Sequence, residues 1–166
     1  MIYLKPWAIE DSEILAEYLN NINIWNNLRD YLPHPYTIDE AEIFIAKQAD
    51  IIPTQNFAII RDDVIVGGIG INLLQDIYKM NVELGYWIAE PYWGIGMATE
   101  AVRLMTVYVF ENFHINRIVA EVFEYNKSSM RVLEKNGYHL ETVTRKGILK
   151  NGLLYDNYIW VLQKIY

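Results

Sequence analysis

The chain has 166 residues, of which 52% are hydrophobic, and this fits one compact domain, residues 1–166, with a sizeable core. It has no run of about 18 apolar residues, and its N-terminal MIYLKPW does not resemble a secretory signal, so we expect a cytoplasmic protein with no membrane partner. The absence of cysteine excludes disulfides, a cysteine nucleophile and thiolate metal sites, and no metal is predicted. The net charge of -7 argues against nucleic-acid binding and favours a cationic partner such as an amine.

The N-terminal part of the chain is predicted to contain an edge strand and two helices. Residues 2–7 have the composition of a short strand that ends near Pro6. Residues 11–20 place apolar side chains at helical spacing after Asp and Ser, which predicts a first helix. The sequence Thr-Ile-Asp-Glu at residues 37–40 is a capping box and predicts a second helix that continues to about residue 50.

Three β-rich runs follow. The first two are separated by a pair of aspartates, which is typical of a tight hairpin. The third run alternates in period 2, so that Glu83 shares a face with Gly85 and Trp87. The three predicted strands span residues 57–61, 64–73 and 81–88.

The second half of the chain alternates helices and strands. Because a strand, a helix and a strand follow one another in its middle, one crossover should be parallel, and the predicted fold class is α/β (α+β). The pair Asn136-Gly137 is typical of a helix C-cap. The predicted elements are a helix over residues 98–113, a strand over 117–123, a helix over 126–136 and strands over 138–145 and 154–162.

A turn rich in small residues joins the third β-rich run to the apolar helix. Gly94, Gly96 and Ala98 alternate there, just before the free amides and the positive dipole end of the helix. This pattern lets a diphosphate approach the main chain, and it predicts a phosphorylated ligand. The alternative is a tight turn that binds no ligand.

Two other phosphate-binding motifs are excluded. A dinucleotide fingerprint needs a third glycine where this chain has Thr99, and too little chain follows for a second nucleotide-binding half. A P-loop needs a Gly-Lys-Ser/Thr sequence, which does not follow the turn.

Four segments in order carry a family resemblance. The sequence Trp-Gly-Ile-Gly-Met-Ala at residues 93–98 is similar to a Q/R-x-x-G-x-G/A loop, except that Trp93 replaces Gln or Arg. Residues 23–36 are similar to a first helical region, residues 126–138 to an N-x-x-S helix with a Gly-aromatic pair, and residues 150–156 to a final hairpin. Together they cover nearly the whole chain and resemble the GNAT superfamily of N-acetyltransferases, within it the Rim-type, ribosomal-protein-alanine acetyltransferase-like branch.

The resemblance implies a fold and a reaction. The fold would be a GNAT-type mixed, mostly antiparallel central sheet of about seven strands, with a parallel splayed pair at the centre and about four flanking helices. The reaction would be direct transfer of acetyl from acetyl-CoA to a primary amine in a ternary complex, with CoA as the product. The amine would belong to a protein N-terminus or to a small molecule.

The resemblance also assigns cofactor-binding residues around the glycine turn, at the end of the preceding strand and on the helix that starts at Asn126. A main-chain amide near Trp87 or Ile88 would polarise the thioester carbonyl. Solvated charge is the alternative role for Lys127 and Arg131. The residues assigned to acetyl-CoA are Trp87, Ile88, Gly94, Ile95, Gly96, Met97, Ala98, Thr99, Asn126, Lys127, Ser129 and Arg131.

Three residues are predicted to be catalytic: Glu83, His34 and Ser129. Similar enzymes carry a carboxylate near Glu83, which would accept the amine proton directly or through water; the alternative is a solvated strand glutamate. His34 is a second candidate base because imidazole titrates near neutral pH, or else it only shapes a rigid loop. Many family members protonate the leaving thiolate with a tyrosine where this chain has Leu133. The Rim-type branch lacks that tyrosine, and there a serine at the position of Ser129 is expected to stabilise the thiolate.

The acceptor pocket is predicted from the first helical region. Its residues would be Trp25, Arg29, His34 and Tyr36, with core packing as the alternative for the aromatic side chains. Similar proteins often form dimers through terminal strands, so a homodimer is one open assembly. A function of another class also stays open, namely a non-catalytic acyl-CoA-binding or sensory domain.

Overall fold

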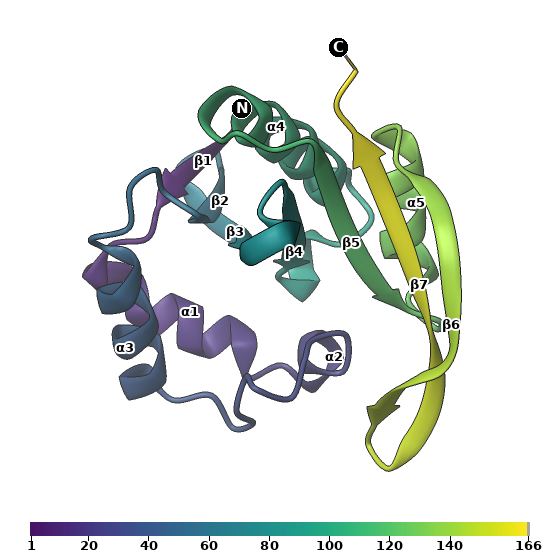
Figure 1. Ribbon diagram of the computed structural model, residues 1–166. Helices are drawn as coiled ribbons and strands as arrows, with labels where there is room; N and C mark the ends of the chain where they lie inside the picture. The colour runs from purple at the N-terminus through teal and green to yellow at the C-terminus, as the bar shows by residue number, and fades with distance from the viewer. Residues whose placement is uncertain (166) are drawn as a thin grey trace.

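The computed structural model describes residues 1–165, which contain a single seven-stranded sheet in the order β1-β2-β3-β4-β5-β7-β6 (Figure 1). Neighbouring strands pair antiparallel except for β4 and β5, which are parallel. This sheet confirms the predicted mixed fold. Its strands are β1 (Ile2–Pro6), β2 (Asn56–Arg61), β3 (Val64–Leu73), β4 (Asn81–Ile88), β5 (Arg117–Phe123), β6 (His139–Lys150) and β7 (Leu153–Gln163).

Helices lie on both sides of the sheet. Figure 1 shows α1, α2 and α3 together on one side, with α4 and α5 on the other. Short 3-10 turns precede α1 and α4 and link β3 to β4. The α-helices are α1 (Ser12–Leu19), α2 (Ile22–Trp25), α3 (Ile38–Gln48), α4 (Met97–Asn112) and α5 (Lys127–Lys135).

The alternation of side chains along β2 explains the two helical layers. Phe57 and Ile59 are buried in the core that faces α4, whereas Ala58 and Ile60 are buried in a second core with α1 and α3. Successive side chains of a strand point to opposite faces, so a continuous apolar run buries both faces. The strand is therefore covered by helices on each side.

The parallel pair at the centre of the sheet separates after a short contact. Its three registered pairs run from Asn81 opposite Arg117 to Glu83 opposite Val119. Beyond Glu83, β4 continues to pair with β3 alone, up to Ile88 opposite Gly67. The two strands thus diverge over the second half of β4, which opens a gap in the sheet.

The ladder also fixes which main-chain groups of β4 face this gap. The Ala89 amide donates to the Val66 carbonyl on the β3 side over 2.8 Å. Because main-chain groups alternate sides along an antiparallel pair, those of Tyr86 and Ile88 point the other way. Their N–H groups therefore face the gap.

Most predicted elements are present with small shifts at their ends. The aspartate hairpin is confirmed, since Asp62 and Asp63 have φ angles of 49° and 65°, as a tight turn with two left-handed residues requires. The single-turn helix α2 was not predicted from periodicity, because four residues are too few for a helical period to be read, although the family resemblance expected a helical region there.

The strand β6 runs five residues beyond its predicted end at residue 145. A bulge lies there, with Lys146 at a φ of 52° and a register shift between Thr144 and Ile148. The Asp156 carboxylate accepts the Lys146 amide at 2.9 Å and the Arg145 guanidinium at 2.8 Å, which stabilises the bulge. A bulge interrupts period 2, so the sequence pattern stops short of the strand end.

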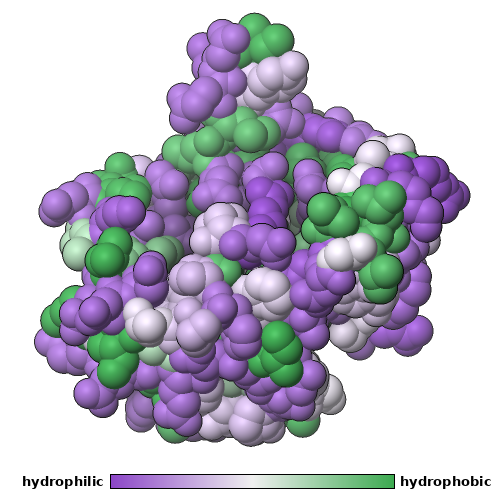
Figure 2. All heavy atoms as spheres, turned by 90° about the horizontal axis from the view of Figure 1, so that it is seen from below, coloured by the Kyte–Doolittle hydropathy of each residue, from purple (hydrophilic) through white to green (hydrophobic). Residues whose placement is uncertain are grey.

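The surface is mostly polar on the face that Figure 2 draws. Figure 2 shows a largely hydrophilic face with hydrophobic side chains scattered in small groups. Among residues 1–165, no helix has the length and apolar character needed to cross a bilayer.

Candidate active site

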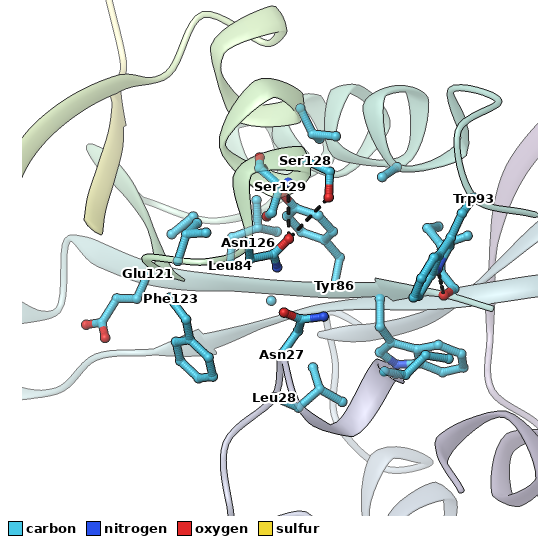
Figure 3. A pocket seen from close by; sticks show the side chains of 18 of the residues that line it. Asn27, Leu28, Leu84, Tyr86, Trp93, Glu121, Phe123, Asn126, Ser128 and Ser129 are labelled. Atoms are coloured by element: carbon cyan, nitrogen blue, oxygen red, sulfur yellow. Dashed lines mark hydrogen bonds between the residues drawn. The ribbon is translucent and has the colours of Figure 1, made fainter. Parts of the chain in front are cut away.

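A groove of about 840 Å³ occupies the gap between β4 and β5. One wall is the segment 23–32, which begins within α2, and the opposite wall is formed by the starts of α4 and α5. Figure 3 shows this arrangement, with Asn27 and Leu28 on one side of the strands and Asn126 and Ser129 on the other. The divergence of β4 and β5, rather than a surface loop, therefore creates the site.

The glycine turn before α4 forms one end of the groove. Gly94 and Gly96 have φ angles of 75° and 85°, and Gly96 is the N-cap of the helix. A Cβ at either position would meet no atom within 4 Å, so the left-handed backbone rather than crowding calls for glycine. A side chain there would strain the turn.

The start of α4 offers main-chain donors to this end of the groove. The first helical bond runs from the Glu100 amide to the Gly96 carbonyl at 3.2 Å. The preceding amides of Met97, Ala98 and Thr99 have no carbonyl one turn earlier to which they can donate, and they lie at the positive end of the helix dipole. These groups can bind an anion.

Trp93 has a structural role in the turn. Its indole N–H donates to the Ile88 carbonyl at 2.7 Å, so it ties the turn back to the end of β4 (Figure 3). The ring is 45% exposed and lines the groove. A tryptophan at this position therefore stabilises the turn, in place of the polar contact that Gln or Arg would make with a ligand.

The first turn of α5 brings a second set of polar groups to the groove. Asn126 is the N-cap and accepts the Ser129 amide at 3.4 Å. The Ser129 hydroxyl lies 2.6 Å from the hydroxyl of Tyr86, which comes from β4. All three residues line the groove, together with Arg131.

Two carboxylates face each other across the diverging strands and share one cation. Arg29 lies 3.3 Å from Glu83 on β4 and 3.6 Å from Glu121 on β5. Asn157 donates to Glu121 at 2.8 Å. Glu83, Glu121 and Arg29 line the groove, which makes this end of it acidic by one net charge.

Trp87 is held by aromatic packing below the groove. It stacks on Trp7 with 6.5 Å between ring centroids and meets Tyr18 edge-on at 6.2 Å. A Cβ on Gly68 would lie 2.7 Å from the indole nitrogen, so glycine leaves room for the ring. Trp87 lines the groove from this fixed position.

Five of the residues assigned from the sequence are not among those that line the groove. Tyr36 is 3% exposed in the core with α1 and α3, where burial raises its pKa to about 12. Ile95 points outward with 51% exposure, and Lys127 lies 4.9 Å from the Tyr158 ring. Trp25 donates its indole N–H to the Leu32 carbonyl at 2.9 Å, and the His34 ring packs on it at 5.3 Å.

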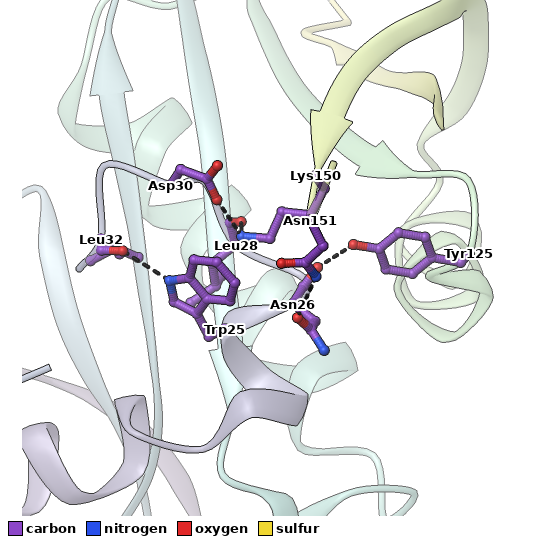
Figure 4. A network of polar contacts seen from close by, with 8 residues as sticks. All are labelled: Trp25, Asn26, Leu28, Asp30, Leu32, Tyr125, Lys150 and Asn151. Carbon is purple, nitrogen blue, oxygen red and sulfur yellow. Dashed lines mark hydrogen bonds and ion pairs between the residues drawn. The ribbon is translucent and has the colours of Figure 1, made fainter. Parts of the chain in front are cut away.

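The segment 23–32 is fixed by the distant β6–β7 hairpin (Figure 4). Lys150 is 2% exposed and donates to Asp30 at 2.6 Å and to the Leu28 carbonyl at 2.8 Å. Its ammonium also lies 3.3 Å from the centre of the Trp25 ring, a cation–π contact. Lys150 is thus the centre of a clamp that holds one wall of the groove.

Further contacts complete this clamp. Asn151 donates to the Asn26 side chain at 2.9 Å, and the Tyr125 hydroxyl donates to the Asn26 carbonyl. No individual role was predicted for Asn26, Tyr125 or Tyr86. A local signal does exist for Glu121, because period 2 in β5 places it on the polar face of the strand. No local signal marks the contact of Lys150 with Asp30, which lies 120 residues earlier in the chain.

The sequence was then compared with known proteins. Residues 2–139 match the acetyltransferase (GNAT) domain. The chain belongs to this family. It is 28% identical over 171 residues to the probable N-acetyltransferase YjcK of Bacillus subtilis, covering 95% of this chain and 91% of that protein. These matches make the protein an acetyltransferase.

Solved structures share the whole fold. The ribosomal L7/L12 α-N-protein acetyltransferase RimL, in complex with coenzyme A, aligns with a TM-score of 0.84 at 16% identity over 98% of this chain and 93% of that one. The spermidine N-acetyltransferase of Vibrio cholerae, with CoA and spermine, aligns with a TM-score of 0.84 at 20% identity over 98% and 95%. The resemblance to the Rim-type branch is in line with the first of these, and the same fold serves acceptors of different kinds.

Proposed function

We propose that residues 1–166 form one domain that transfers acetyl from acetyl-CoA to a primary amine in a ternary complex. The observation that supports this most strongly is the groove at the splayed strands, with a left-handed glycine turn and free helix amides at one end and paired carboxylates at the other. The RimL and spermidine acetyltransferase structures contain CoA, which favours the same donor here.

The groove fits an acyl-CoA by its chemistry. The amides of Met97, Ala98 and Thr99, with the turn at Gly94 and Gly96, offer donors and a positive dipole to a diphosphate. Arg131 and Lys135 line the same region and supply positive charge. When bound, acetyl-CoA supplies an activated acetyl thioester.

The chain's own groups would act on that thioester from β4. The Ile88 amide faces the gap, so it is placed to donate to a carbonyl oxygen that gains negative charge. A donor held by a paired strand needs little reorganisation during the reaction. The Trp93 indole donates to the Ile88 carbonyl, so the peptide that follows this amide is also held in place.

Glu83 is the base that we favour. Its carboxylate lies in the groove and is paired with Arg29, so an incoming ammonium would compete with Arg29 for the same oxygen atoms. A nearby carboxylate can then orient the amine and take up its proton, directly or through water. His34 packs on Trp25 and is not among the residues that line the groove, which leaves Glu83 as the better placed of the two.

The acceptor is proposed from the charge of the groove. A protein N-terminus and a small amine both present a single ammonium, and the relatives include enzymes for each. The groove end with Glu83, Glu121 and Arg29 carries one net negative charge, which matches one ammonium. We therefore propose that the acceptor is a primary amine whose charge is concentrated at the reacting nitrogen. A cytoplasmic location and a homodimer stay predictions.

The test is release of free CoA thiol from acetyl-CoA with a panel of amines that contains N-terminal peptides, spermidine and small monoamines. We expect turnover with at least one of them and a fall in kcat/KM of about 100-fold in Glu83→Gln. Glu111→Gln, an exposed substitution on α4, is the matched control and should keep full activity. Binding of acetyl-CoA without turnover of any amine would favour a non-catalytic acyl-CoA-binding domain.

A further inference from the structure

A phenol from β4 contacts Ser129 at the start of α5. The Tyr86 hydroxyl lies 2.6 Å from the Ser129 hydroxyl and 3.2 Å from the Ser129 carbonyl oxygen. Figure 3 shows the Tyr86 ring rising from the strand toward this first helical turn. Two hydrogen-bonded hydroxyl groups usually lie about 2.7–2.8 Å apart. The 2.6 Å contact between the two side chains is therefore a full hydrogen bond, and it is closer than the 3.2 Å contact with the carbonyl oxygen.

The two hydroxyl groups have two ways of sharing their hydrogen atoms. In one, the Tyr86 hydroxyl donates to the Ser129 carbonyl and accepts a hydrogen bond from the Ser129 hydroxyl, so the serine has no hydrogen left for the groove. In the other, Tyr86 donates to the Ser129 hydroxyl oxygen, and the serine hydrogen is free to point into the groove. Hydroxyl hydrogens rotate to suit their partners, so a negative charge in the groove selects the second arrangement.

We propose that Tyr86 is a positioning residue for acetyl transfer, which donates to the Ser129 oxygen and so directs the serine hydrogen toward the leaving sulfur. This inference rests on the proposed function. A chain of hydrogen bonds strengthens its last member, because each donor polarises the next. Ser129 would thereby be a better donor than an isolated serine.

The position of Leu133 explains why the donor comes from the strand. This residue is fully buried, with 0% exposure, between α5 and the sheet. An aliphatic side chain at that point of α5 offers no hydrogen to the groove. Tyr86 enters from the opposite element and reaches the helix one turn earlier, at Ser129.

Acetyl transfer needs neither the Tyr86 nor the Ser129 hydroxyl to lose its proton. The acceptor nitrogen bonds to the acetyl carbon, the bond from that carbon to sulfur breaks, and its electron pair stays on sulfur. The proton of the nitrogen passes to Glu83. Ser129 holds the thiolate by a hydrogen bond, and the sulfur later takes a proton from water, while Glu83 gives its own proton back to the solvent and neutralises the hydroxide that is left.

This role needs a neutral phenol, and the surroundings provide it. Burial raises the pKa of the Tyr86 hydroxyl well above its ordinary value, the bond to Ser129 opposes this in part, and nearby Tyr138 adds to it. Tyr86 therefore keeps its proton across the neutral range. It acts as a hydrogen-bond donor rather than as a source of protons.

The experiment measures the pKa of the thiol of bound CoA, from the ultraviolet absorbance of the thiolate across a pH series. Tyr86→Phe, Ser129→Ala and the double variant are compared with the unaltered protein. Since a hydrogen bond to a charged group is worth about one pH unit, we expect the thiol pKa to rise by about one unit in Ser129→Ala. Tyr86→Phe should raise it by less and lower kcat about threefold, with the KM for acetyl-CoA unchanged.

The double variant decides whether Tyr86 acts through the serine. We expect Tyr86→Phe to add nothing once Ser129 is alanine, in both the thiol pKa and kcat. An equal effect in both backgrounds, or an unchanged thiol pKa in Tyr86→Phe, would overturn the inference. If CoA does not bind at all, it is the proposed function that fails instead.

Tyr138→Phe is the matched control. Its hydroxyl is also buried, at 3% residue exposure, and bonds to Thr106 at 2.9 Å, but it does not line the groove. It should lower stability to a similar extent and leave the thiol pKa unchanged. A rise in that pKa equal to that of Tyr86→Phe would point to a general loss of packing and contradict the proposal.

Discussion

The two ends of the groove are built in different ways. At the end formed by β4, α4 and α5, the groups that can bind an anion come from local patterns, namely a glycine turn, a helix N-terminus and an Asn cap. At the end formed by the segment 23–32, the wall is held by Lys150 and Asn151, more than 100 residues later in the chain.

Under the proposed function, this difference would separate donor binding from acceptor binding. Main-chain amides bind any diphosphate that fits, so the donor end needs only backbone geometry. The acceptor end is shaped by side chains that can be exchanged without altering the sheet. Changes at one end should therefore leave the function of the other intact, and substitutions at each end test this independence.

The largest effect is expected at the glycine turn. Gly96→Val places a β-branched side chain at a φ of 85° and should weaken acetyl-CoA binding by about 10- to 100-fold, since such strain costs about 1–3 kcal/mol. Calorimetric titration measures this. Gly137→Val is the control, because it has a similar φ of 80° after α5 outside the groove. It should cost stability alone, and equal losses of binding in both variants would contradict the local role of Gly96.

An intermediate effect is expected at the clamp. Lys150→Met removes a buried cation from Asp30, the Leu28 carbonyl and the Trp25 ring, and should raise the acceptor KM about three- to tenfold through a looser wall. Steady-state kinetics should show no change in the KM for acetyl-CoA. The exposed Lys79→Met is the control for loss of a charge. An equal change in both KM values would mean that the two ends are coupled.

The smallest effect concerns the bulge of the same hairpin. The Lys146 amide and the Arg145 guanidinium hold the pKa of Asp156 below its ordinary value. A carboxyl with a lowered folded pKa stabilises the fold above its unfolded pKa, and that stability is lost as the pH falls through the folded value. Unfolding midpoints of the unaltered protein and Asp156→Asn should therefore differ at pH 7 and converge as the pH falls from about 4 through the lower folded pKa. A difference that persists at low pH would argue against this ion pair.

The sequence predicts the glycine turn and the helix cap well for a physical reason. The turn at Gly94 and Gly96 and the cap at Asn126 depend on local backbone chemistry, which residue type and spacing encode directly. The parallel pair was likewise expected from the order of strand, helix and strand. The four aromatic and basic residues assigned to the acceptor pocket were harder, because only Arg29 reaches the groove.

The misplaced residues share a cause. Apolar and aromatic side chains give the same pattern whether they line a pocket or fill a core, so Trp25 and Tyr36 could not be assigned from composition. Contacts such as Lys150 with Asp30 require the register of the hairpin against α2, which no local signal contains. The Tyr86–Ser129 pair, 43 residues apart, was missed for the same reason.

The central claim is that main-chain amides of residues 94–99 bind the diphosphate of acetyl-CoA. Its most direct test is an NMR titration that follows these amide signals with acetyl-CoA and, separately, with acetyl-pantetheine, which lacks the diphosphate. We expect large saturable shifts at residues 94–99 with acetyl-CoA and small ones with acetyl-pantetheine. Saturable binding of acetyl-CoA that leaves these signals unmoved would contradict the claim.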